Sequence, residues 1–188
     1  LGNLEPVLRE HGYELNIVDA TSTALSEIDP TDADLVVILG NEDGVYEKAE
    51  KPYIAFEEKW LSQRLAAEQP TLGVCFGAQI MASALGGEVY KGESTQVGYR
   101  PVEPTTAGQD SPVSVFAGIP VVEWHGDTFT LPEGVTRLAG SADYDNEAFS
   151  VGDWALAVQF HPEVDDDLFA KWVAGDRSTI DALGLDPE

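Results

Sequence analysis

Hydrophobic residues follow two different spacings along the chain, and the spacing changes near residue 87. In the first part, apolar positions at helical spacing alternate with short apolar runs; Leu4, Val7 and Leu8 share one helical face that ends at Gly12. The pattern then predicts a strand over 15–18, a strand over 35–39, a helix from about 53 to 68, a strand over 71–75 and a helix to about 85. Such alternation predicts a parallel sheet with helices on both faces.

After Gly87 the pattern consists of short strand-like runs and one final helix. The runs lie near 97–102, 121–124, 136–139 and 155–160, and the helix begins at about Asp166. A length of 188 residues suits one domain with a full core. We therefore expect a single three-layer α/β domain over 1–188 with a mostly parallel central sheet. The chain begins at Leu1 and not at methionine, and we expect a missing first strand ahead of the first helix.

The charge of the chain excludes several classes of partner. It has 34 acidic and 10 basic residues, a formal net charge of -24. Phosphate backbones and anionic membranes would be repelled, so we expect no nucleic acid and no membrane as partner. The acidity fits a salt-adapted source and an ordinary acidic bacterial protein equally well.

Localisation and metal binding are predicted from smaller features. No apolar run approaches the roughly 20 residues of a membrane helix, no secretory leader opens the chain, and one cysteine permits no internal disulfide, so we expect a cytoplasmic protein. The run Asp165-Asp166-Asp167 could bind a cation, but acidic residues at a helix start more often cap the helix. We therefore expect no metal site.

The single cysteine has the setting of a nucleophile. Cys75 lies between Gly73 and Gly77, after an apolar run and before a predicted helix. Gly-x-Cys-x-Gly is typical of a nucleophile elbow, in which a strand turns sharply into a helix and the middle residue takes a strained backbone conformation. The sulfur then lies near the positive end of that helix, where a thiolate is favoured. The alternative is a buried, inert cysteine.

A second cluster of chemical groups follows the last predicted strand, where the sequence reads His161-Pro162-Glu163. A cysteine nucleophile needs a base to take its proton, and the base needs a third group to fix its tautomer. His161 and Glu163 suit these two roles. The alternatives are a capped strand end for His161 and a solvated loop charge for Glu163.

Together, the elbow and the His-Pro-Glu end resemble the class I (triad) glutamine amidotransferases, most closely free-standing members similar to the amidotransferase part of GMP synthase. The resemblance covers nearly the whole chain and extends to the segments 35–40, 44–46, 85–90, 97–99 and 124–129. It implies a flavodoxin-like fold and hydrolysis of the glutamine side-chain amide. Cys75 would form a γ-glutamyl thioester, His161 would act as base and then acid, and Glu163 would orient His161. Ammonia would go to an unidentified acceptor or a synthetase partner, and no cofactor is implied.

The resemblance also implies positions for the oxyanion hole. One donor would be the backbone N–H of Phe76, and the second would come from the backbone of Gly40 and Asn41. The family usually has Gly-Gly-Pro where this chain has Gly40-Asn41-Glu42. Asparagine tolerates left-handed backbone angles, so the loop can still turn. Glu42 and Asp43 would oppose an oxyanion unless they point away from it.

The glutamine itself would be bound by residues from three segments. These substrate-binding candidates are Gln79, Gly98, Trp124 and His125. The family often has glutamate where this chain has Gln96.

Three other interpretations stay open. The same triad can cleave γ-glutamyl amides or peptides other than glutamine, and the departure at 40–42 is compatible with a catalytically silent regulatory subunit. Related cysteine peptidases and chaperones place histidine directly after the nucleophile, where this chain has Phe76. No Gly-x-x-x-x-Gly-Lys-Ser/Thr loop appears, so we do not expect ATP-driven synthesis within this chain. The sequence does not predict an oligomeric state.

Overall fold

The computed structural model of the chain describes residues 1–185, apart from the side chain at position 23. Contacts between Cα atoms divide the chain into two units. The larger unit is Ile17–His161, and the smaller unit joins Leu1–Asn16 with Pro162–Glu188. Across the described residues, no helix is long and apolar enough to cross a membrane.

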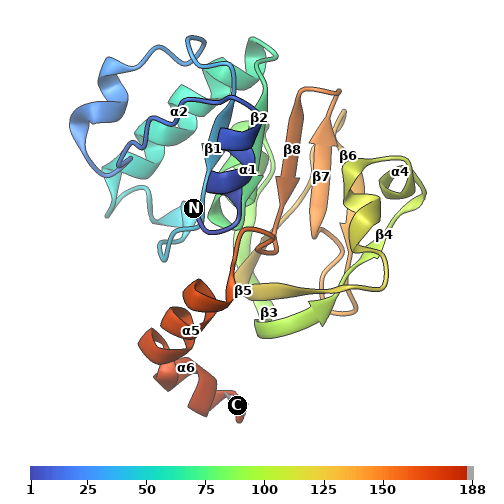
Figure 1. Cartoon of the computed structure of the whole chain (residues 1–188). Coiled ribbons are helices and arrows are strands. Elements are labelled where there is room, and N and C mark those ends of the chain that lie inside the picture. The colour runs from blue at the N-terminus through green and yellow to red at the C-terminus, as the bar shows by residue number, and fades with distance from the viewer. Residues whose placement is uncertain (186–188) are drawn as a thin grey trace. The chain divides into compact units, whose positions relative to one another are not determined.

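A six-stranded sheet forms the centre of the larger unit, in the order β1-β2-β8-β7-β6-β4 (Figure 1). Its strands are β1 Val36–Ile38, β2 Thr71–Val74, β4 Glu103–Pro104, β6 Thr136–Gly140, β7 Ala148–Val151 and β8 Ala155–Val158. The pairs β1/β2 and β2/β8 are parallel, and the other three pairs are antiparallel. Consequently β1, β2, β8 and β6 run in one direction, which confirms the predicted α/β class with a mostly parallel central sheet.

Helices α2 (Pro52–Ala66) and α3 (Phe76–Ala84) cover one face of this sheet. Because side chains alternate along a strand, Ala155 and Ala157 of β8 pack into the core with α2 and α3, while Leu156 and Val158 pack into a second apolar cluster. That second cluster includes residues of the short helix η3 (Pro112–Phe116). The remaining short helices are η1 Thr23–Glu27, η2 Val45–Glu47 and α4 Thr106–Gln109.

A buried arginine joins α2 to the loops that precede β1 and β2. The guanidinium of Arg64 donates to the backbone oxygens of Pro30 at 2.7 Å, Ala33 at 3.0 Å and Pro70 at 2.6 Å. Its Nε also donates to Thr71 Oγ1 at 3.1 Å. Burial lowers the pKa of Arg64, and these acceptors replace the water that the cation loses.

A second sheet in the larger unit consists of the antiparallel strands β3 (Val89–Pro101) and β5 (Pro120–Phe129). In their register, Gln96 lies opposite His125 and Val97 opposite Trp124, and a register shift separates Lys91 from Gln96. Both strands extend beyond the runs predicted at 97–102 and 121–124.

The smaller unit contains α1 (Leu4–Glu10), α5 (Asp166–Gly175) and α6 (Arg177–Ala182). Asp165 caps α5, because its carboxylate accepts from the N–H of Leu168 at 2.8 Å. The N–H of Asn3 donates to the carbonyl of Glu163 at 2.7 Å, which joins the two segments of this unit. The run Asp165-Asp166-Asp167 thus starts a helix, as the capping interpretation predicted.

Two details of the secondary structure differ from the sequence prediction. Residues 15–18 form no strand, and Ile17 is 76% exposed, so this run lacks the neighbour that a strand needs for its backbone hydrogen bonds. Strands β4 and β7 were not predicted, because β4 has only two residues and β7 has a polar residue among its four.

Candidate active site

Cys75 lies on a sharp turn from β2 into α3. Its backbone has φ 55° and ψ -110°, and Glu68 is the other non-glycine residue with positive φ in the described chain. This conformation costs free energy and persists only where surrounding contacts hold it. The N–H of Cys75 donates to Val158 at 2.9 Å, and its carbonyl accepts from Ala78 and Gln79 at 2.9 and 3.1 Å. The strained elbow that the sequence predicted is therefore present.

The two glycines beside the cysteine are required by close packing. A Cβ on Gly77 would lie 2.1 Å from the carbonyl oxygen of Ile38. A Cβ on Gly73 would lie 2.5 Å from Met81 Sδ and 2.6 Å from the Gly77 oxygen. Helix α3 therefore approaches β1 and β2 more closely than any side chain at these positions allows.

The nucleophile candidate Cys75 and the base candidate His161 meet at Gly40, which follows β1. A Cβ built on Gly40 would lie 3.2 Å from His161 Cε1, 3.7 Å from Cys75 Cβ and 4.0 Å from Cys75 Sγ. His161 is positioned by its N–H, which donates to Val122 of β5 at 2.8 Å. The sulfur also lies 4.0 Å from the carbonyl oxygen of Trp124. The structure thus brings four of the predicted site residues together.

The loop after Gly40 is fixed by side chains that the sequence interpretation did not use. Asn41 Nδ2 donates to the Tyr53 hydroxyl at 2.8 Å, and Asn41 Oδ1 accepts from the N–H of Asp43 at 3.0 Å. Hydrogen bonds from Lys51 and from Tyr53 to the Asp43 carboxylate keep the pKa of Asp43 below its ordinary value. Asn41 does not have the left-handed backbone conformation that the sequence analysis considered for it. The charge of Asp43 is neutralised by Lys51, so it does not oppose an oxyanion as an unpaired carboxylate would.

The other oxyanion candidate is the backbone of Phe76. This residue begins α3, and the first N–H groups of a helix have no carbonyl partner within it. Its N–H therefore suits a developing negative charge beside the sulfur.

Two substrate-binding candidates have surroundings that the sequence did not predict. Gln79 is buried, and its Nε2 donates to Gln159 Oε1 at 3.1 Å and lies 3.5 Å from the Asp127 carbonyl oxygen. Gly98 has φ 96° and pairs with Glu123 across β3 and β5. The amide nitrogen of Gln79 is thus used within the protein, and its contact with substrate stays a prediction.

Near Cys75 lies a buried cluster of charged groups, Glu123, His125 and Glu147, of which the sequence analysis had named only His125. His125 Nε2 is 3.2 Å from Glu123 Oε2 and 4.0 Å from Glu147 Oε2. Burial alone would lower the pKa of His125, but ion pairing with Glu123 and the charges of Glu147 and Cys75 outweigh it and raise the pKa to about 9. Burial, with the nearby charge of Glu123, raises the pKa of Glu147 to about 7. Glu123, a carboxylate within the apolar residues of β5, was the signal in the sequence that could have revealed the cluster, because glutamate is rarely buried.

Glu163 belongs to the smaller unit. The residue is 4% exposed. Its proposed action on His161 stays a prediction from the two-residue spacing.

Comparison with known proteins adds to this geometry. Residues 2–173 match the family described as glutamine amidotransferase class-I. The chain is 34% identical over 160 residues to the glutamine-hydrolysing GMP synthase of Thermomicrobium roseum, which covers 82% of this chain and 27% of that protein. It is 38% identical over 102 residues to one GMP synthase subunit of Methanoculleus marisnigri, covering 50% of this chain and 52% of that protein. The chain therefore spans about a quarter and about half of these two relatives.

Among solved structures, the fold is similar to the crystal structure of a glutamine amidotransferase from Thermotoga maritima. The TM-score is 0.85 at 31% identity, and the match covers 100% of this chain and 81% of that one.

Proposed function

The chain belongs to the class-I glutamine amidotransferases, an enzyme family, and we propose that it hydrolyses the side-chain amide of glutamine with Cys75 as nucleophile. One observation carries the proposal. The ring of His161 and the sulfur of Cys75 lie within 4.0 Å of the same point above Gly40, at a strained strand-to-helix turn. A thiol on such a turn, with an imidazole close by, suits nucleophilic attack on an amide.

The first half of the proposed reaction makes a thioester. His161 takes the thiol proton while Sγ attacks the amide carbon, and the resulting oxyanion accepts from the N–H of Phe76 and from the backbone of Gly40 and Asn41. His161 then donates its proton to the amide nitrogen. The C–N bond breaks, ammonia leaves, and the γ-glutamyl group remains on Cys75.

The second half restores the enzyme. His161 takes a proton from water as the water oxygen attacks the thioester carbon. The C–S bond breaks, the proton returns to the sulfur, and glutamate leaves. We assign Glu163 the task of orienting the His161 ring, on the strength of its sequence spacing and of the family resemblance.

The use of the ammonia is part of the same proposal. The Methanoculleus relative is named as one subunit of GMP synthase. By analogy, we propose that the ammonia produced here goes to a synthetase partner, which would supply the nucleotide chemistry.

The test is release of ammonia and glutamate from glutamine by purified protein, without ATP, in low and high salt. Wild type should release the two products in equal amounts, and Cys75→Ala and His161→Ala should lose at least about 1000-fold in rate. Far-UV circular dichroism of both variants controls for folding. Release from γ-glutamyl peptides but not from glutamine would replace the proposed substrate. No release from any γ-glutamyl compound, with a synthetase partner present, would overturn the proposal.

A further inference from the structure

Three buried side chains of the kinds that bind metal ions lie close together beside β5, the strand that contains Trp124. Glu123 and His125 lie on β5, and Glu147 lies just before β7. Their side chains are 0%, 2% and 0% exposed. One ligand atom from each lies within 4.8 Å of the others. We call these three residues the Glu-His-Glu cluster.

The atoms that face one another in this cluster have no hydrogen-bond partner among residues 1–185. They are both carboxylate oxygens of Glu123, Nε2 of His125 and Oε2 of Glu147. The approach of 3.2 Å between His125 and Glu123 lacks the geometry of a hydrogen bond. Buried polar atoms without hydrogen-bond partners are costly, and a set of such atoms that gather around a common centre suits a bound cation.

The remaining atoms of the cluster are fixed by outer contacts. His125 Nδ1 lies 2.9 Å from the carbonyl oxygen of Asp127. Since a carbonyl only accepts, Nδ1 carries a hydrogen, so loss of the other ring proton leaves the lone pair of Nε2 facing the carboxylates. Glu147 Oε1 accepts from Ser141 Oγ at 2.7 Å, which leaves Oε2 facing the centre. Metal-binding histidines and carboxylates characteristically have such outer partners.

The charge of the cluster is also unbalanced. Within the described chain, neither Glu123 nor Glu147 forms an ion pair with lysine or arginine. Protonation of His125 offsets one of the two buried carboxylates. A divalent cation bound to the neutral imidazole offsets both.

We propose that Glu123, His125 and Glu147 bind a divalent transition-metal ion of the zinc or manganese class. Zinc ligands at about 2.0–2.1 Å in tetrahedral geometry lie about 3.3 Å apart. The separations of 3.2 and 4.0 Å from His125 Nε2 to the two carboxylates are near this value, and all three ligand atoms lie within 4.8 Å of one another. One imidazole with two carboxylates suits zinc and manganese, whereas magnesium prefers an octahedral shell of oxygens and water.

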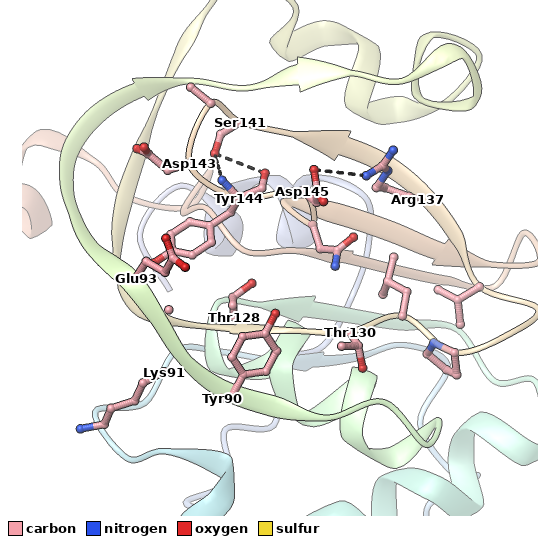
Figure 2. Close-up of a pocket in the computed structure, with 16 residues that line it drawn as sticks. Tyr90, Lys91, Glu93, Thr128, Thr130, Arg137, Ser141, Asp143, Tyr144 and Asp145 are labelled. Atoms are coloured by element: carbon pink, nitrogen blue, oxygen red, sulfur yellow. Dashed lines mark hydrogen bonds and ion pairs between the residues drawn. The ribbon is translucent and has the colours of Figure 1, made fainter.

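A pocket lies beside the cluster. It has a volume of about 700 Å³ and lies between β3 and β5 on one side and the segment 141–146 on the other (Figure 2). Ser141 and Tyr144 line it, and both also contact the cluster. Ser141 bonds Glu147, and the Tyr144 ring centroid lies 5.2 Å from that of His125.

The proposed ion has a structural task. Trp124 lies between two of the ligands on β5, and its carbonyl oxygen is 4.0 Å from Cys75 Sγ. A metal bound to Glu123 and His125 would therefore stiffen the backbone beside the nucleophile without taking part in a reaction step.

Zinc binding to the full chain tests this proposal directly. The protein carries Cys75→Ala, so that no thiolate competes for the metal. It is treated with a chelator and dialysed against Zn²⁺, and its metal content is then measured. In a parallel sample, Co²⁺ replaces Zn²⁺ and the visible absorption spectrum is recorded. We expect one ion per chain and a loss of affinity of at least about 100-fold in Glu147→Gln. A control variant, Asp166→Asn with Asp167→Asn, removes two exposed charges at the start of α5 and should keep the ion.

A melting experiment provides an independent readout. Zn²⁺ should raise the Tm of the Cys75→Ala protein but not that of the same protein with Glu147→Gln, whose circular dichroism reports its folding. Three results would overturn the proposal: no stoichiometric binding, binding that Glu147→Gln leaves unchanged, or loss of the ion in the Asp166/Asp167 control. None of them bears on glutamine hydrolysis.

Discussion

Replacing Gly77 by alanine tests whether the close approach of α3 to β1 builds the elbow. The new Cβ would lie 2.1 Å from the Ile38 carbonyl oxygen and 2.8 Å from the Ile38 carbonyl carbon. Since ordinary C···O contacts are about 3.3 Å, helix and strand must separate by about 1 Å. Overpacking costs about 1–3 kcal/mol, and a backbone neighbour that cannot rotate away places this variant near the upper end. The better helix propensity of alanine returns up to about 1 kcal/mol.

We therefore expect Gly77→Ala to lower the free energy of unfolding by about 2 kcal/mol, measured by urea denaturation. Gly175→Ala is the matched control, because, apart from its chain neighbours and the backbone of its own helix, no atom lies within 4 Å of the position of its new Cβ. That control should be unchanged or slightly more stable. The strand that the helix displaces leads into Gly40, so glutamine hydrolysis by folded Gly77→Ala should fall at least about 10-fold. A variant as stable and as active as wild type would refute the reasoning.

Three further changes probe the site, a buried acid and a buried cation. Gly40→Ala places a Cβ 3.2 Å from His161 Cε1, so the rate of ammonia release should fall at least about 10-fold. The free energy of unfolding should change by less than about 1 kcal/mol. An unchanged rate would contradict the site geometry. Burial raises the pKa of Glu57 to about 7, above the ordinary value of 4.5, so stability should fall as pH rises from 4.5 to 7. Glu57→Gln should then stabilise the protein by up to about 3 kcal/mol at pH 8 and hardly at pH 4.5, and a pH-independent difference in urea unfolding would count against this. Arg64→Met leaves the backbone oxygens that accept from the guanidinium without a donor, so it should lower the free energy of unfolding by about 3–5 kcal/mol. Gln63→Ala, at an exposed neighbouring position, should lower it by less than about 1 kcal/mol. Equal losses in the two variants would show that these buried hydrogen bonds are unimportant.

The parts of the fold predicted correctly depend on local signals. Helix α2, strand β2 and helix α3 carry the apolar spacing of their final structures, and the glycines around Cys75 mark the elbow. The prediction at 15–18 was wrong because a strand needs a neighbour that no local pattern supplies, and Ile17 is exposed. Strand β7 was missed because four residues with one polar member give a weak pattern.

In the candidate site too, local motifs could be predicted from the sequence, whereas contacts between distant residues could not. Cys75 and His161 could be named as candidates because the roles predicted for them follow from short motifs. The pairing of Asp43 with Lys51 depends on how the loop after β1 folds onto the start of α2. The approach of Glu147 to His125 joins residues more than twenty positions apart, and only the packing of β5 against the segment before β7 creates it.

Covalent labelling of Cys75 tests the central claim most directly. A diazoketone analogue of glutamine carries an electrophile where the substrate carries its amide, and a nucleophilic thiol at that position becomes alkylated. We expect one label per chain, located at Cys75 by mass spectrometry of peptides, with loss of ammonia release in proportion and protection by glutamine. A folded protein whose Cys75 stays unlabelled, or which is labelled elsewhere while hydrolysis stops, would contradict the account.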